Sequence, residues 1–460
     1  MFVVIVMAAL AGVSCAVPLG PGYSIERQRL EVVFVRAPQR RVDVRASWRV
    51  KNTGDRPLTS LDVEIPEAKT RGLSQLRIES GGTELRPSRA ASARAVRVVL
   101  PEPLAVKAKW EFSVSYSLAG DAAADAGVVV DDRGFVLPPG DWAPAVLPPA
   151  GQGSFARGGG APKKWEMTVR VPEGFRVYGS GRVRGEKKEA DSIVFRFQQR
   201  RESGLPFAAG GAYQETRVAT AGGDVILWTL EAMPKEPAEA AAEATARTER
   251  FYGAEFGERD AGSRIVRIIE CPAKRDCWAV PGAALPGREI YTTEFWSSET
   301  RAVDRQLALS RLDFRVHPEW REEPYPMAAL ANYAADLAAI ARAGGDARHR
   351  VVRDLLAEFD RAEKPGPEKA VLNVRLSDGE PARRSAELKS ELFVFALEDA
   401  AGHEALHGAL LHLLHSYEGR DWHAADLRSA VEQESGKDLA GVFRAWLAET
   451  GIPAEFRSRY

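Results

Sequence analysis

Near the end of the chain, two histidines stand four residues apart with a glutamate directly after the first, in the run His403-Glu404-Ala405-Leu406-His407. On a helix, residues four apart project from the same face, about 40° from each other. Two such imidazoles can supply two of the ligands that a zinc ion needs. A glutamate beside the metal can act as the general base toward a metal-bound water. The spacing therefore predicts metal-assisted hydrolysis if a third ligand is present.

The third ligand decides whether this run is a site. An antiparallel return of the chain after the run favours Glu432 or Glu434, which would then face His407. Against a site, the same helical face carries Leu410 and Leu414, a pattern typical of core packing. Further histidines crowd the region and make a chance match easier. We therefore favour the interpretation that the run holds no catalytic metal, and keep zinc bound by His403 and His407 as the alternative. The additional histidines are His412, His415 and His423.

The elements that would position these residues fall into two parts. With 45% apolar residues in a chain of 460, two or three domains with cores of their own are expected. The first part, residues 17–225, is predicted to be an all-β, sandwich-like domain, because its apolar and polar residues alternate with a period of two. The alternating runs are 30–35, 42–50, 95–100, 110–116, 165–171 and 192–197.

Residues 226–460 are predicted to form an α-rich domain with a small sheet. A helix is expected over 237–252 and a strand over 265–270. Amphipathic helices should follow from Val303 onward, with Gly436 and Gly451 as helix stops. The chain as a whole is thus expected to be a multidomain α+β protein.

Composition and the N-terminal segment bear on where the protein works. The 63 basic and 64 acidic residues give a net charge of −1, so nucleic acid is not an expected partner. Residues 1–16 combine a short apolar run with a small-residue cleavage pattern and predict a signal peptide, hence a periplasmic or extracellular protein. Cys15 is an alternative lipoprotein site. No segment of the mature chain is long and apolar enough to cross a membrane. Cys271 and Cys277 are expected to form a local disulfide rather than a metal site.

Several short segments, in order, resemble the aminopeptidase N family of zinc metallopeptidases over nearly the whole mature length. The resemblance implies an N-terminal β domain followed by a thermolysin-like α-rich domain. The segments are Val50-Lys-Asn-Thr-Gly-Asp, Leu100-Pro-Glu-Pro-Leu, Arg170-Val-Pro-Glu-Gly-Phe, Phe251-Tyr-Gly-Ala-Glu-Phe-Gly and Val280-Pro-Gly-Ala-Ala-Leu-Pro-Gly, the last resembling the loop with the family's GxMEN motif.

The same resemblance implies that this chain lacks the family's metal site. In the family, an HExxH helix is followed after eighteen residues by a glutamate ligand, and the same spacing separates Leu309 from Ala328, with Pro318 and Trp320 between them. None of the replacing side chains can hold zinc, because arginine stays protonated and leucine and alanine have no donor atom. The positions that have lost the family residue are Arg305 and Leu309 for the histidines, Gln306 for the base, Ala328 for the glutamate, Leu285 for the glutamate of GxMEN, and Glu387 for the oxyanion tyrosine.

The sequence therefore predicts a non-catalytic, aminopeptidase N-like protein without a cofactor, which binds a peptide or an envelope protein. The alternative is an active zinc peptidase that uses His403, His407 and Glu404, with Glu432 or Glu434 as third ligand. The sequence indicates neither a particular ligand nor an oligomeric state.

Overall fold

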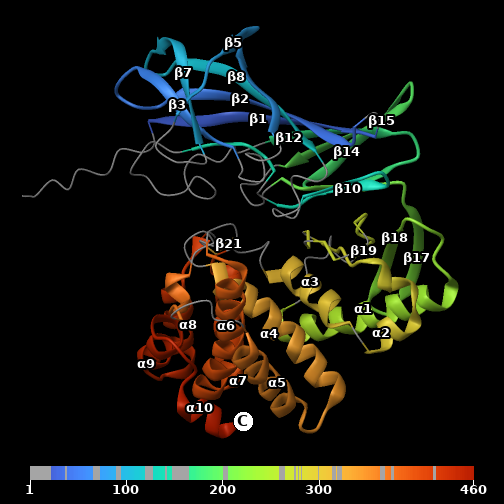
Figure 1. The fold of residues 1–460 in the computed structure, drawn as a ribbon, viewed down its shortest axis with the longest axis vertical. Coiled ribbons are helices and arrows are strands. Elements are labelled where there is room, and N and C mark those ends of the chain that lie inside the picture. The colour runs from blue at the N-terminus through green and yellow to red at the C-terminus, as the bar shows by residue number, and fades with distance from the viewer. Residues whose placement is uncertain are drawn as a thin grey trace, which may run out of the picture.

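The fold is described from a computed structural model of the chain (Figure 1). The expected signal segment, with Cys15, lies outside the described residues, and so does Trp320. The described residues are 22–36, 39–65, 73–89, 95–119, 128–139, 142–147, 165–199, 206–257, 265–273, 276–277, 279–280, 282–298, 300–312, 317–318, 324–362, 368–374, 378–417 and 421–460.

An eight-stranded sheet forms most of the N-terminal half, in the order β14-β15-β12-β1-β2-β8-β4-β5 (Figure 1). Its neighbours are antiparallel except for β1 and β12, which pair in parallel. Every second side chain of β12 is buried, as the alternating sequence predicts for a sheet with one face in the core. The strands are β1 (Tyr23–Val35), β2 (Arg41–Asn52), β4 (Leu73–Ser80), β5 (Thr83–Leu85), β8 (Lys109–Ala119), β12 (Trp165–Pro172), β14 (Arg182–Glu189) and β15 (Ser192–Gln199).

Two four-stranded sheets complete the β domain, in the orders β11-β3-β7-β6 and β13-β16-β10-β9. One apolar core joins all three sheets, since Val32 of β1, Val98 of β7 and Phe135 of β10 belong to the same buried cluster. The predicted all-β, sandwich-like domain is confirmed. The added strands are β3 (Leu58–Glu64), β6 (Ser88–Arg89), β7 (Ala95–Leu104), β9 (Val129–Asp131), β10 (Gly134–Leu137), β11 (Ala145–Val146), β13 (Arg176–Gly179) and β16 (Ala208–Gly211).

A smaller sheet, β17-β18-β19-β20, stands between the β domain and the helices (Figure 1). The division expected between residues 225 and 226 falls inside β18. Ile226 and Trp228 of this strand pack in one cluster with Val129 of the β domain, while Val225 and Leu227 face the helical core. The small sheet thus joins the two parts. Its strands are β17 (Gln214–Thr220), β18 (Gly223–Thr229), β19 (Val266–Ile269) and β20 (Ala283–Ala284).

The rest of the chain is helical, as predicted, and buries one continuous apolar core. Gly436 ends α8 with a φ of 66°, a left-handed conformation that glycine adopts without strain. Among the described residues, no helix combines the length and apolar character needed to span a bilayer. The helices are α1 (Lys235–Phe256), α2 (Thr293–Ser298), α3 (Arg301–Leu312), α4 (Pro324–Ala343), α5 (Ala347–Arg361), α6 (Glu380–Ala401), α7 (His403–Ser416), α8 (Ala424–Ser435), α9 (Ala440–Phe443) and α10 (Ala454–Arg459), with short strands β21 (His317–Pro318) and β22 (Asp421–Trp422).

Candidate functional site

The helices expected to carry the lost metal site, α3 and α4, pack against each other. Arg305 of α3 is partly buried, and its Nε donates a hydrogen bond to Oδ1 of Asn332 on α4. Burial lowers the pKa of the Arg305 guanidinium. Arginine nevertheless stays protonated in proteins, so this position offers a positive charge and no lone pair to a metal.

The other residues that align with the family's metal helices are buried or partly buried in this protein. Gln306 is 4% exposed, and its Oε1 accepts a hydrogen bond from the backbone N–H of Leu285. Leu309 packs in the helical core at 7% exposure, and Ala328 is partly buried on α4. A catalytic zinc needs three donor side chains, and these residues provide none. The residues present therefore do not fit zinc at this place.

A network of charged and polar groups lies between α3, α4 and α6. Nδ2 of Asn332 donates to Oε2 of Glu391 at 2.8 Å, and Arg301 donates to Oε1 of Glu391 at 2.7 Å and to Asp336 at 2.6 Å. Glu391 is 1% exposed, and burial, together with the nearby Asp336 carboxyl, raises its pKa well above the usual value. Glu387, at the oxyanion position, lies 3.5 Å from Arg384 instead.

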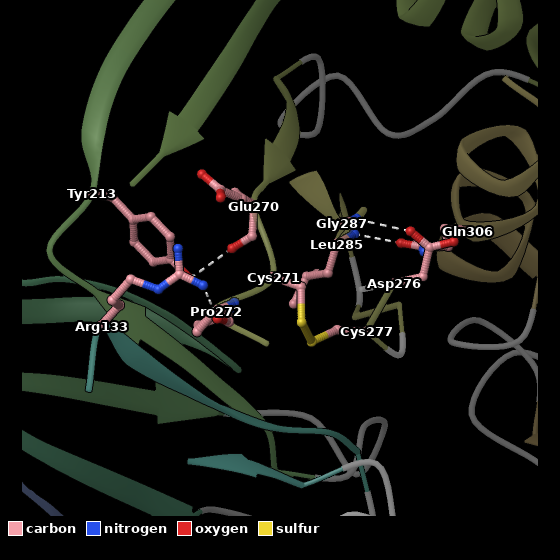
Figure 2. Close-up of a disulfide and its surroundings, with 10 residues drawn as sticks. All are labelled: Arg133, Tyr213, Glu270, Cys271, Pro272, Asp276, Cys277, Leu285, Gly287 and Gln306. Atoms are coloured by element: carbon pink, nitrogen blue, oxygen red, sulfur yellow. Dashed lines mark hydrogen bonds between the residues drawn. A yellow bond between two sulfur atoms is a disulfide. The ribbon is translucent and has the colours of Figure 1, made fainter. Parts of the chain in front are cut away.

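Residues 285–287, which follow β20, are hydrogen-bonded to α3 and to the loop that carries the disulfide (Figure 2). Besides the bond from Leu285 N–H to Gln306, the Leu285 carbonyl accepts from Cys277 N–H and the Pro286 carbonyl accepts from Cys271 N–H, both at 2.8 Å. Cys271 and Cys277 form a disulfide, which confirms the pairing expected from sequence. A further bond at 2.8 Å runs from Gly287 N–H to Oδ1 of Asp276. Both backbone groups of Leu285, the carbonyl of Pro286 and the N–H of Gly287 are thus bonded within the chain.

The run 403–407 is helical, as predicted, but the carboxylate that meets it comes from α1. Ligand atoms of Glu255, His403 and His407 all lie within 4.8 Å of one another. Oε2 of Glu255 is 2.7 Å from Nδ1 of His407 and 3.5 Å from Nε2 of His403, and the two imidazole centroids are 4.0 Å apart. We call these three residues the histidine cluster. It joins the last turn of α1 to the first turn of α7.

The ring nitrogens that face away from Glu255 also have partners. Nδ1 of His403 lies 2.7 Å from Oε1 of Glu398, a buried carboxylate that also accepts from Arg348. Nε2 of His407 lies 3.4 Å from the hydroxyl of Tyr333. Burial and the Glu398 carboxylate together raise the pKa of Tyr333 well above its usual value. Glu398 therefore contacts His403 directly and interacts with His407 through Tyr333.

Exposure differs between the two imidazoles. The side chain of His403 is 51% exposed, whereas that of His407 is 8% exposed and stacks on Phe256 with ring centroids 5.4 Å apart. Burial lowers the pKa of His407 to about 4, with a smaller contribution from His403. The buried imidazole is therefore neutral at neutral pH, which is the form that can bind a metal.

The glutamates expected from sequence as the third ligand are engaged elsewhere. The antiparallel return does form, because α8 packs against α7. However, Oε1 of Glu432 accepts from Leu439 N–H at 3.0 Å, and Glu434 lies beside Gly408. Glu404, the expected base, is exposed on α7. Glu255 is not among the ligands predicted from the sequence, although it belongs to the segment 251–257 that resembles the family.

Comparisons with known proteins locate this fold among zinc peptidases. No family model and no curated protein matches the sequence. Among solved structures, an M1 zinc metallopeptidase from Deinococcus radiodurans is similar at 16% identity, with a TM-score of 0.62, over 95% of this chain and 96% of that one.

A single-residue variant of the Deinococcus radiodurans M1 zinc metallopeptidase, bound to a Tyr-Ser-Ala substrate, is similar at 18% identity, with a TM-score of 0.64, over 94% of this chain and 96% of that one. The expectation of a β domain followed by an α-rich domain is therefore correct. The chain has the two-domain, aminopeptidase N-like fold of the M1 zinc metallopeptidases.

Proposed function

We propose that this protein is a non-catalytic relative of the M1 zinc metallopeptidases that binds a peptide or protein partner. The observation that carries the proposal is the hydrogen bond from Leu285 N–H to Gln306. When residues 305–309 are aligned with the family's HExxH motif, Gln306 occupies the position of the general base. In this chain its buried amide links Leu285, the residue that follows β20, to α3, and a glutamine offers no carboxylate to activate water.

The three ligand positions support the same conclusion. Arg305 is bonded to Asn332, Leu309 is part of the apolar core, and Ala328 has only a methyl group. Restoring a metal would require donor atoms at all three places at once. The chemistry of a metal-activated water is therefore absent from this part of the protein.

Arg305 supports a binding role for the region between α3 and α4. Within the described part of the chain, its Nε bonds to Asn332, and no hydrogen bond to its two terminal nitrogens is seen. A guanidinium fork of this kind binds a carboxylate through two parallel hydrogen bonds. We propose that a carboxylate of the partner, such as a peptide C-terminus or an acidic side chain, is bound by Arg305.

We further propose that the protein works outside the cytoplasm, in the periplasm or beyond it. The support comes from the apolar and small residues of 1–16, and from the disulfide between Cys271 and Cys277, because disulfides persist mainly in oxidising compartments. Acylation at Cys15 would tether the protein to a membrane surface.

A peptide assay tests the proposal in two steps. Purified protein without a histidine tag is incubated with zinc and a set of short peptides, and the released amino acids are measured. No release above the buffer blank is expected. Binding of the same peptides is then compared with that of peptides whose C-terminus is amidated and which lack acidic side chains.

Variants make the binding step specific. Arg305→Ala should lose binding of the peptides with a free carboxylate, whereas Arg350→Ala, a change at an exposed arginine of α5, should not. Binding that is equal for free and amidated peptides would contradict the assignment to Arg305. Zinc-dependent release of amino acids would contradict the non-catalytic function.

The alternative, an active zinc peptidase at 403–407, is favoured by one observation, the convergence of Glu255 with the two histidines. The burial of His407 beneath Phe256 and Tyr333 speaks against it, because a peptidase needs its metal at the floor of an open groove. In the peptide assay, release of amino acids that is lost on His403→Ala would establish this alternative.

A further inference from the structure

We propose that Glu255, His403 and His407 bind one divalent transition metal ion, with zinc as the expected species. This metal site is separate from the position where the family holds its metal. It would clamp the last turn of α1 to the first turn of α7, two segments that are far apart in the sequence. The proposal extends beyond peptide binding and does not depend on it.

The distances between the ligand atoms favour a metal. In a tetrahedral zinc site with bonds of about 2.05 Å, neighbouring ligand atoms stand roughly 3.3 Å apart. The two distances from Oε2 of Glu255, 2.7 Å to His407 and 3.5 Å to His403, bracket that value. Small side-chain adjustments would therefore place all three donor atoms around one ion.

The choice of donors indicates the class of metal. Two imidazoles and one carboxylate suit zinc, cobalt or nickel, whereas magnesium and calcium prefer oxygen ligands throughout. Three protein ligands leave a fourth position for water, and the half-exposed side chain of His403 gives the ion a route from solvent.

The second hydrogen-bond partners of the two histidines, Glu398 and Tyr333, independently support a metal site. Metal-binding histidines generally donate their second ring N–H to a carboxylate or another acceptor, which fixes the tautomer. With its proton on Nδ1, His403 donates to Glu398 and turns the lone pair of Nε2 toward Glu255. With its proton on Nε2, His407 donates to the hydroxyl of Tyr333 and turns the lone pair of Nδ1 the same way. Each imidazole then keeps its other ring nitrogen, Nε2 of His403 and Nδ1 of His407, unprotonated beside Glu255.

A separate function for the cluster follows from its place in the fold. Asn332 of α4 contacts Arg305 of α3 and Glu391 of α6. The next residue, Tyr333, contacts His407 of α7 and Phe395, which lies further along α6. The contact with Arg305 and the contact with His407 are thus made by two side chains that leave α4 about 100° apart. A metal at the cluster would join α1 to α7 and would therefore act on helix packing.

The experiment is a metal titration of untagged, metal-stripped protein. Cobalt binding is followed by its visible absorption, and zinc is then added in competition. We expect one equivalent of cobalt with the strong absorption of a four-coordinate site, its displacement by zinc, and a higher melting temperature with metal. No stoichiometric binding of either metal would overturn the proposal.

Changes at His403 and Glu255, whose side chains are 51% and 23% exposed, keep the test interpretable if a change at the buried His407 prevents folding. His403→Ala and Glu255→Gln should each weaken zinc binding by about 100-fold or more, with unchanged circular dichroism. Glu398→Gln should weaken zinc binding about 10- to 100-fold, the usual effect of losing a group that orients a ligand.

A matched control comes from the same helix. His412 and His415 are exposed, and changing both to alanine should leave zinc affinity unchanged. Zinc binding that survives His403→Ala and Glu255→Gln, or that is lost in this control, would overturn the proposal and indicate adventitious binding by surface histidines. Peptide hydrolysis is scored separately, because it tests the proposed function and not the metal site.

Discussion

Replacing Gln306 with leucine separates a structural role of this residue from a catalytic one. Gln306 is 4% exposed and Leu285 is fully buried, so the change leaves the Leu285 N–H without a partner and out of reach of water. An unsatisfied buried donor costs about 1–3 kcal/mol. Leucine and glutamine are similar in volume, so the cavity contribution should be small. We expect Gln306→Leu to lower the free energy of unfolding by about 2 kcal/mol.

Denaturation of the untagged protein in urea, followed by circular dichroism and by tryptophan fluorescence, measures this loss. A loss of about 2 kcal/mol corresponds to a melting temperature lower by roughly 4–8 °C for a domain of this size. The control is Gln433→Leu, at an exposed position of α8, which should stay within about 0.5 kcal/mol of the parent. A Gln306→Leu protein that is as stable as the parent, or more stable, would refute the reasoning. Increased stability is the usual result when a functional residue is removed from an active site.

Three further changes test the remaining contacts. Leu309→Ala should lower the free energy of unfolding by about 3 kcal/mol in a denaturant titration, because the side chain belongs to the core, and a loss below about 1 kcal/mol would place it elsewhere. Replacing Cys271 and Cys277 together with serine should lower that free energy by about 2 kcal/mol through the freed loop, and an unchanged denaturation midpoint would argue against the disulfide. Glu391→Gln should flatten the pH dependence of stability. The raised pKa of Glu391 means that the folded state holds the proton more tightly, so the stabilisation is present below the unfolded pKa near 4.5 and is lost as the pH rises through the folded pKa. Equal slopes for parent and variant above pH 5 would contradict this.

The strands were predictable where one face is buried and the other is not. The alternation in 165–171 gives β12 nearly to the residue, and 42–50 lies inside β2. Pairing across long distances was not predictable. The parallel pairing of β1 with β12, from Gln28 with Trp165 to Val33 with Arg170, depends on tertiary packing that no local pattern records.

The contacts of the candidate site residues could not be predicted from the sequence, and their assignment to the family's metal positions stays a prediction. Spacing to the family identified Arg305 and Gln306, but the partners Asn332 and Leu285 emerge only when α3, α4 and β20 are packed together. The third member of the histidine cluster was missed for a similar reason. Glu255 lies far upstream of His403 in the sequence. The antiparallel return of the chain after the motif favoured glutamates of α8, whereas His407 contacts Glu255 of α1.

The most direct test of the account is an anomalous difference map, recorded at the zinc absorption edge on crystals grown with zinc. We expect a peak between Glu255, His403 and His407, and no peak between α3 and α4. A zinc peak beside Arg305 and Ala328 would contradict the claim that this chain has lost the family's metal site.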